Sequence, residues 1–127
     1  MPANVPEGGI WLSTRPADMR KSFDGLAALV RNELGGDVVS GGWFVFADRR
    51  RTMMKIIGFG PGGCWIWSQR LEQGLFAVPF GPRGAAAPLS RTDLQALLDG
   101  VDFAAVRRRK RYARPRVAGP GKISGIR

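Results

Sequence analysis

Three groups of residues in this sequence have types or spacings that could support chemistry, and the first is a glycine-rich segment. Gly58–Gly63 fits the literal pattern G-x-G-x-x-G, which in dinucleotide-binding folds approaches a pyrophosphate. That fingerprint needs a helix N-terminus directly after the glycines, because the helix end holds the phosphates. Residues 64–67 read Cys-Trp-Ile-Trp instead, which is typical of a strand. We therefore predict a hairpin turn here and no nucleotide site.

The second group contains the residues that could support nucleophilic, acid–base or metal chemistry. Cys64 is the only cysteine and the chain has no His to activate it, so we predict a buried strand residue rather than a nucleophile. The same composition excludes a Cys-rich zinc site and most His-based metal sites, and we predict no metal and no other cofactor. Four carboxylates could meet in the fold, but their positions fit a cap, a helix face and turns: Asp18, Asp24, Asp48 and Glu72. We predict no catalytic residue and no enzyme.

The third group is basic, and its charge is concentrated at one end of the chain. The 127 residues have a formal net charge of +10. Residues 1–104 hold eleven Lys and Arg and ten acids, whereas residues 105–127 hold nine Lys and Arg and no acid. Clustered Arg neutralises phosphates without reading base sequence, so this tail predicts DNA-backbone binding, and a merely solubilising extension is the alternative. The predicted contacts in the tail are Arg107, Arg108, Arg109, Lys110, Arg111, Arg114 and Arg116.

A smaller basic cluster lies at a predicted hairpin tip. Arg49, Arg50 and Arg51 stand at the turn, and Lys55 follows on the return strand. Arginines at a turn are often only solvated, but beside so basic a tail we interpret these four as a supplementary contact to the DNA backbone.

Hydrophobic periodicity predicts the helices that must position these residues. Apolar residues recur every three or four positions from Met19 to Leu34, which predicts one long amphipathic helix with Asp18 as its cap. Ser90 with Asp93 has the spacing of a capping box, and it predicts a short helix that ends at Gly100.

Short runs of alternating residues predict the strands. They fall at residues 9–13, 43–46, 52–57, 64–69 and 75–78, and residues 79–88 are expected to be a connector. The predicted class is α+β: a small antiparallel β-meander packed against one long helix, a short C-terminal helix and a disordered basic tail. We place the globular domain at residues 1–103 and the tail at 104–127.

The predicted strands are apolar on both faces, which one helix cannot cover. The short second helix, loops and the first strand would cover the other face, or that face binds another protein chain. We predict an exposed apolar patch that includes at least one of Trp43, Trp65 and Trp67. Alternation along the strand places Trp65 and Trp67 on the same face.

No run of apolar residues approaches the roughly 18 that a membrane span needs, and residues 1–7 do not have the pattern of a signal peptide. We therefore expect a cytoplasmic protein with no membrane partner.

Three segments in a fixed order resemble a known family. The first reads DMRKSFDGL from Asp18, the second is Phe-Val-Phe from Phe44 with basic residues after it, and the third reads RLEQG from Arg70. Over residues 9–103 the chain is similar to the TnpB accessory protein of the sixty-six group of bacterial insertion sequences, the second-open-reading-frame-like family. At two positions where that family usually carries Lys and Arg, this chain has Gln69 and Leu75, which removes positive charge from the sheet.

The resemblance implies a non-catalytic accessory protein for DNA transposition, encoded beside a separate and larger transposase. The expected partners are that transposase and DNA bound without sequence preference, with self-association also possible, in the bacterial cytoplasm and at the nucleoid. The alternatives are a protein–protein adaptor with no DNA-binding role and a small nuclease-like enzyme. The family motifs predict a characteristic polar surface, with its members linked as ion pairs: Arg20, Lys21, Asp24, Arg70 and Glu72.

Overall fold

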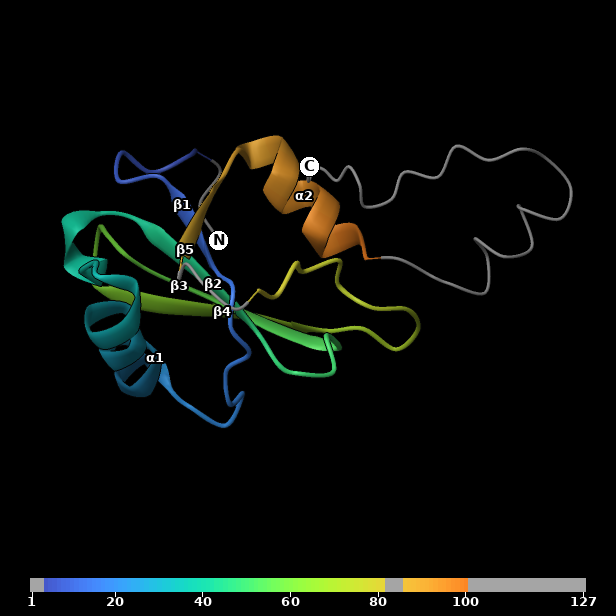
Figure 1. Ribbon diagram of the computed structural model, residues 1–127. Coiled ribbons are helices and arrows are strands. Elements are labelled where there is room, and N and C mark those ends of the chain that lie inside the picture. Colours follow the sequence, from blue (N-terminus) through green and yellow to red (C-terminus); the bar gives the residue numbers. More distant parts are fainter. Residues whose placement is uncertain (1–3, 82–85, 101–127) are drawn as a thin grey trace, which may run out of the picture.

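A five-stranded mixed sheet forms the centre of the molecule in the computed structural model, which describes residues 4–81 and 86–100 (Figure 1). The strands are β1 (Ile10–Ser13), β2 (Trp43–Ala47), β3 (Met53–Phe59), β4 (Cys64–Arg70) and β5 (Ala86–Leu89). Their order across the sheet is β4-β3-β2-β1-β5. β1 runs parallel to β2, and all other neighbours are antiparallel.

The α+β class is confirmed, but the purely antiparallel meander is wrong. β2, β3 and β4 form the predicted meander, whereas β1 adds a parallel pairing and β5 overlaps the end of the predicted connector. Residues 75–78 were predicted as a strand and form no strand of the sheet. Their alternation has another cause, because Phe76 and Val78 are 1% and 3% exposed and turn into the core from an irregular segment.

The predicted long helix is shorter and begins later. α1 (Phe23–Leu29) continues as a π-helical turn, η1 (Val30–Leu34), and a separate 3-10 turn, η2 (Val38–Ser40), follows. Ser22 occupies the N-cap position, so Asp18 is not the cap. Gly35 ends the helix in the left-handed conformation, at a φ of 72° that a side chain would strain.

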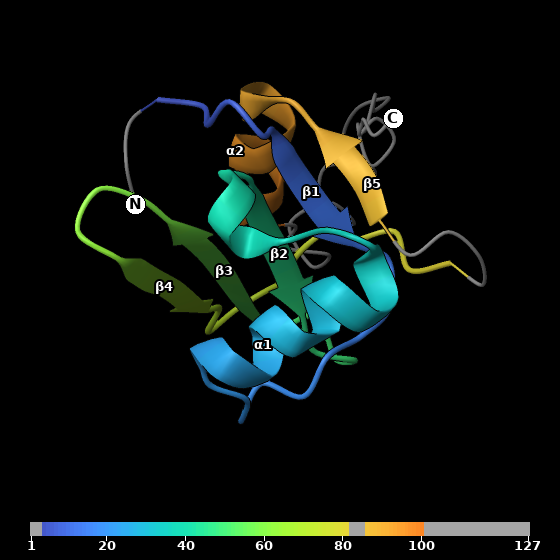
Figure 2. The same ribbon diagram turned by 90° about the vertical axis from the view of Figure 1, so that its left-hand side faces the viewer.

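The second helix is confirmed together with its cap. α2 (Arg91–Asp99) begins after Ser90, whose hydroxyl accepts a hydrogen bond from the Asp93 amide while the Asp93 carboxylate accepts one from the Ser90 amide. α1 and α2 lie on opposite faces of the sheet (Figures 1 and 2). Each helix therefore buries one of the two apolar faces that the strands present.

The two faces have separate cores. On the α1 side, Leu26 and Val30 pack with apolar residues of β2 and β3. On the α2 side, Leu94 and Leu97 pack over a larger set that includes Trp43. Trp43 is only 3% exposed, so the expected apolar patch does not include it.

Trp65 and Trp67 lie on one face and are both half-buried against the α2-side core, as their alternation predicted. The most exposed large apolar residues of the strands are Phe59 (40%) and Ile66 (38%), and their register places them on the α1 side. No described helix is long and apolar enough to cross a membrane. The predicted domain boundary and all the predicted tail contacts lie outside the described residues.

Candidate nucleic-acid interface

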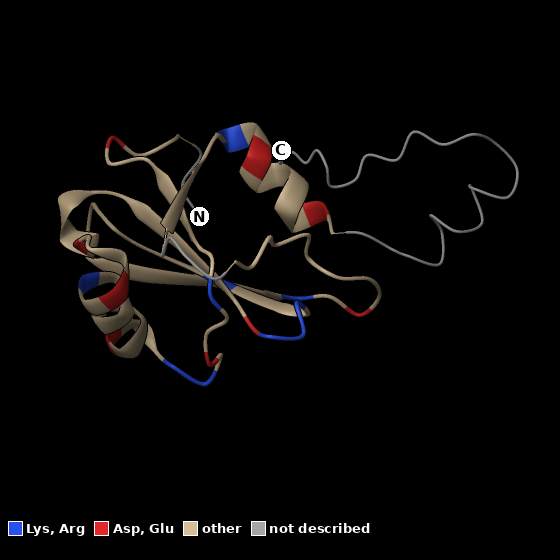
Figure 3. Ribbon diagram, viewed as in Figure 1, with Lys and Arg blue, Asp and Glu red and all other residues tan. Residues whose placement is uncertain are grey.

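Four arginines from three separate segments line one open depression on the surface. Arg20 comes from the segment before α1, Arg49 and Arg50 from the β2–β3 turn, and Arg70 from the end of β4. The depression has a volume of about 530 Å³, and its remaining lining residues are Ala17, Asp18, Met19, Asp48 and Met53. Figure 3 shows the basic residues of the segment before α1 and of the β2–β3 turn along the same side of the molecule.

The β2–β3 turn is built by Asp48. One carboxylate oxygen accepts hydrogen bonds from the amides of Thr52 and Met53, at 2.9 and 3.1 Å. The other accepts from the Thr52 hydroxyl at 3.3 Å. Aspartate commonly closes turns in this way, and the closed turn leaves Arg49 and Arg50 exposed at its tip.

The segment before α1 is fixed beside this turn by two hydrogen bonds. The Ala17 amide donates to the main-chain oxygen of Ala47 at 2.9 Å, at the end of β2. The Lys55 ammonium of β3 donates to the main-chain oxygen of Lys21, also at 2.9 Å. Together these contacts hold Arg20 near the end of β2, beside the β2–β3 turn.

Arg20 is held by Asp18, two positions before it. Its Nη2 lies 2.7 Å from Asp18 Oδ2, and its Nε also donates to the same carboxylate. The hydrogen bonds from Arg20 hold the pKa of Asp18 well below its usual range, and they raise the pKa of Arg20. The Arg20 side chain is nevertheless 90% exposed, so the guanidinium keeps donors free for a ligand.

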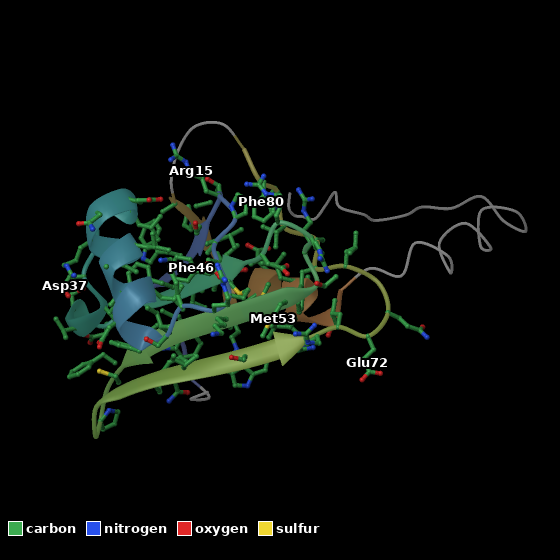
Figure 4. All side chains as sticks on the ribbon, turned by 90° about the horizontal axis from the view of Figure 1, so that it is seen from below. Arg15, Asp37, Phe46, Met53, Glu72 and Phe80 are labelled. Atoms are coloured by element: carbon green, nitrogen blue, oxygen red, sulfur yellow. The ribbon has the colours of Figure 1, made fainter. Side chains whose placement is uncertain are left out.

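Arg70 reaches the depression because of strand register. It lies opposite Met53 in the β3–β4 pairing, directly after the hairpin tip. Its Nη2 lies 3.8 Å from Met53 Sδ, a weak contact that leaves the side chain exposed. Figure 4 labels Met53 on β3 beside this end of β4.

The depression carries a net positive charge. Four guanidinium groups face two carboxylates, which leaves a formal charge of +2. Both carboxylates are already engaged, Asp48 by its own turn and Asp18 by Arg20. The arrangement therefore favours an anion over a cation, and guanidinium donors match phosphate oxygens in shape and charge.

Two members of the predicted hairpin cluster have structural partners instead. Arg51 donates its Nε–H to the main-chain oxygen of Val78 at 2.9 Å, and its guanidinium lies over the Phe80 ring at 4.4 Å. Lys55 bonds to the main chain of Lys21. The structure thus divides the predicted cluster, with Arg49 and Arg50 at the depression and the other two engaged elsewhere.

The predicted polar surface is divided as well. Arg20 and Arg70 line the depression, whereas Lys21, Asp24 and Glu72 do not. Figure 4 shows Glu72 on the loop after β4, pointing away from the sheet. In the described part of the chain the one ion pair is Arg20–Asp18, which lies partly outside the predicted set. No signal in the sequence predicts that Arg20 lies beside the β2–β3 turn, because this arrangement depends on how the strands are ordered.

The placement of the acidic residues and of Cys64 bears on metal and thiol chemistry. Residues 4–81 and 86–100 hold no group of three or more His, Cys, Asp or Glu side chains that could bind a metal ion. Cys64 was predicted to be buried and is exposed, at the start of β4, which is the outer strand of the sheet.

Comparison with known proteins agrees with the sequence motifs. The model of the family described as IS66 Orf2 like protein matches residues 8–108. Two curated proteins of Sinorhizobium fredii (strain NBRC 101917 / NGR234) are similar. The uncharacterized protein y4hO is 34% identical over 94 residues, which cover 74% of this chain and 81% of the relative. The uncharacterized protein y4jC is 31% identical over 100 residues, covering 79% and 85%.

No solved structure matches the chain. The family match extends from β1 through α2 and includes every residue that lines the depression. On this match the protein belongs to the IS66 Orf2-like family, whose members are transposition-associated accessory proteins of insertion sequences.

Proposed function

We propose that this protein is a non-catalytic accessory factor for transposition that binds the DNA backbone through its arginine depression and its basic tail. Family membership supports the association with transposition. The observation that carries the DNA-binding part is the meeting of Arg20, Arg49, Arg50 and Arg70 around one open surface. Three segments far apart in the sequence contribute to it, so it is a product of the fold.

The chemistry of the depression fits phosphate rather than base edges. Exposed guanidinium groups neutralise backbone phosphates and release counterions, which gives salt-dependent affinity without sequence preference. Asp18 orients Arg20, and the Asp48 turn presents Arg49 and Arg50. The nine basic residues of 105–127 would extend the same contact along the duplex.

A second candidate is an adaptor that docks on the transposase and has no DNA-binding role. The exposure of Phe59 and Ile66 on the α1 side favours it, since they are diagonal neighbours on the sheet and contiguous exposed apolar surface can mark a protein contact. A pull-down with the transposase of the same element, with and without terminal-repeat DNA, separates the two. An adaptor binds equally in both conditions, whereas our proposal requires DNA to strengthen capture.

The experiment that tests the function is transposition of the intact element in cells. Arg70→Ala removes one side of the depression, and Arg31→Ala removes an exposed arginine of η1 that does not line it. We expect Arg70→Ala to lower the transposition frequency and Arg31→Ala to leave it unchanged. Exposed charges contribute only about 0–1 kcal/mol to stability, so both variants should melt near the wild type. A large loss of melting temperature in Arg70→Ala would show that the residue is structural and contradict its assignment.

A further inference from the structure

The outer strand β4 has an unpaired main-chain edge. Three main-chain hydrogen bonds fix which groups of β4 face outward. The Gly60 amide donates to the Gly63 oxygen and the Leu71 amide to the Thr52 oxygen, so both of these pairs between β3 and β4 are hydrogen-bonded. The Asp48 amide donates to the Met53 oxygen, so Met53 bonds to the β2 side and not to β4. In an antiparallel ladder, hydrogen-bonded and non-bonded pairs alternate. Bonding to β3 therefore uses alternate β4 residues, and the others direct their N–H and C=O groups away from the sheet. The outward set is Cys64, Ile66, Ser68 and Arg70.

This edge lacks the features that usually prevent strand addition. β4 is seven residues long, contains no Pro or Lys, and carries its one charge at its last residue. No described residue pairs with its outer side. The opposite edge of the sheet, β5, has four residues and includes Pro88, which cannot donate a hydrogen bond. Natural sheets protect edges with short strands, prolines and charges, so β5 is protected and β4 is not. Figure 2 shows β4 as the outermost strand on its side.

We propose that the β4 edge pairs, antiparallel, with the β4 edge of a second copy of this chain, around a two-fold axis at Trp67. In this register Cys64 faces Arg70 of the other copy, and Ile66 faces Ser68. Every outward-facing residue then lies in a hydrogen-bonded pair. Four such pairs exchange about eight main-chain hydrogen bonds across the interface. The result is one continuous sheet of ten strands.

Charge and side-chain pairing select a second copy as the partner. The only charge of β4 lies opposite an uncharged cysteine, so no like charges meet across the interface. On the α2 side the two Trp67 side chains are cross-strand neighbours, at the Cβ separation of about 4.5–5.5 Å where aromatic pairs stabilise a sheet. Trp67 is half-buried within one chain, and the second copy would cover more of it.

The pairing also fixes the relation between two arginine depressions. Arg70 lies on the same face of β4 as Ile66, which is the α1 side. A two-fold axis perpendicular to the sheet keeps the α1-side faces of both copies on the same side of the joined sheet. The two Arg70 residues then lie six positions apart along the paired strands, or about 20 Å. The dimer does not depend on the proposed function, but it would present both depressions to one duplex.

Charge substitutions at two exposed positions test the proposed register in the full-length chain. Ile66→Lys with Ser68→Lys places lysines opposite lysines, whereas the matched pair Ile66→Lys with Ser68→Glu places opposite charges together. Sedimentation equilibrium should show a wild-type dimer. The first variant should raise the dissociation constant at least about tenfold, and the second should stay near the wild type. A wild type that stays monomeric, a transposase complex formed by a monomer, or equal dissociation constants for the two variants would overturn the proposal.

A disulfide provides an independent readout. Arg70→Cys introduces a thiol opposite Cys64 of the other copy, whereas Ser68→Cys places one opposite Ile66, as a matched control. Within one chain residues 64 and 70 are about 20 Å apart along the strand, too far for a bridge. With oxidised glutathione, Arg70→Cys should form a covalent dimer linked between positions 64 and 70, and Ser68→Cys should form far less. Equal cross-linking of both variants, or bridges only between two Cys64 residues, would rule out this register.

Discussion

Arg51 donates its Nε–H to the main-chain oxygen of Val78 across 2.9 Å, joining the β2–β3 turn to a segment 27 residues later. Its guanidinium also lies over Phe80, and its backbone has a positive φ of 62°. Arg50, the residue before it, is exposed and lines the depression. Consecutive arginines thus have different roles, one in stability and one at the surface.

Arg51→Ala should therefore destabilise the fold, whereas Arg50→Ala should not. The first removes a hydrogen bond from a charged donor together with a cation–π contact, and we expect a loss of about 1–3 kcal/mol in the free energy of unfolding. The second changes an exposed turn residue and should stay within about 0.5 kcal/mol. Urea denaturation measures both. Equal stability of the two variants would show that the Val78 contact contributes nothing.

Gly58→Ala should disrupt the packing of the tryptophans. A Cβ at this position would clash with Trp65 Cζ2 and lie 3.0 Å from Trp43 Cδ1, and those two rings meet edge to face. Overpacking of this kind costs about 1–3 kcal/mol. Thermal unfolding and tryptophan fluorescence report it, with Gly81→Ala as the control because its Cβ would meet nothing within 4 Å. An unchanged melting temperature for Gly58→Ala would contradict the packing described here.

The Asp18–Arg20 pair should be visible in a carboxyl titration. The pKa of Asp18 is held below its usual range by the Arg20 hydrogen bonds, so the folded state favours the ionised form. Any stability from the pair is present above the ordinary Asp pKa of about 3.9 and is lost as the pH falls through the lowered value. We expect NMR titration to show Asp18 ionised well below pH 3.9, and Arg20→Ala to return its pKa toward that value. An ordinary Asp18 pKa in the wild type would mean that the pair does not persist in solution.

Removal of residues 105–127 should weaken DNA binding in a salt-dependent way. If the tail contacts about five phosphates, it contributes roughly −4 to −5 to the slope of log K against log salt. The truncated protein should lose that part of the slope and keep its fold, since every described element ends before residue 105. DNA affinity that is unaffected by the truncation would exclude the tail as a contact.

Local signals in the sequence predicted most of the elements, and long-range pairing accounts for what they missed. The Ser90–Asp93 spacing and the alternation around Trp65 each predicted their structure, because capping and strand facing depend on near neighbours. Ala86–Leu89 has weak strand propensity and forms a strand only because β1 is available as a partner. The predicted start of the first helix was wrong because Met19 fits the apolar periodicity, although the chain becomes helical only at Phe23.

The candidate site was predicted in part for the same reason. Arg49 and Arg50 were predicted from their own turn, and Arg70 from a family motif. Arg51 was grouped with them, and its hydrogen bond to Val78 could not be predicted because Val78 is distant in the sequence. The convergence of Arg20 with the hairpin depends on the bond from Ala17 to the end of β2, which no local pattern shows.

The most direct test of DNA-backbone binding at the depression is fluorescence anisotropy of the full-length chain with a labelled duplex over a range of salt concentrations. Arg49→Ala combined with Arg50→Ala removes two of the four guanidinium groups, and Arg31→Ala, which removes one exposed arginine outside the depression, is the control. We predict that the double variant binds more weakly to unrelated sequences alike, with a salt slope shallower by about 2, while the control matches the wild type. A double variant with wild-type affinity and slope would contradict DNA binding at the depression.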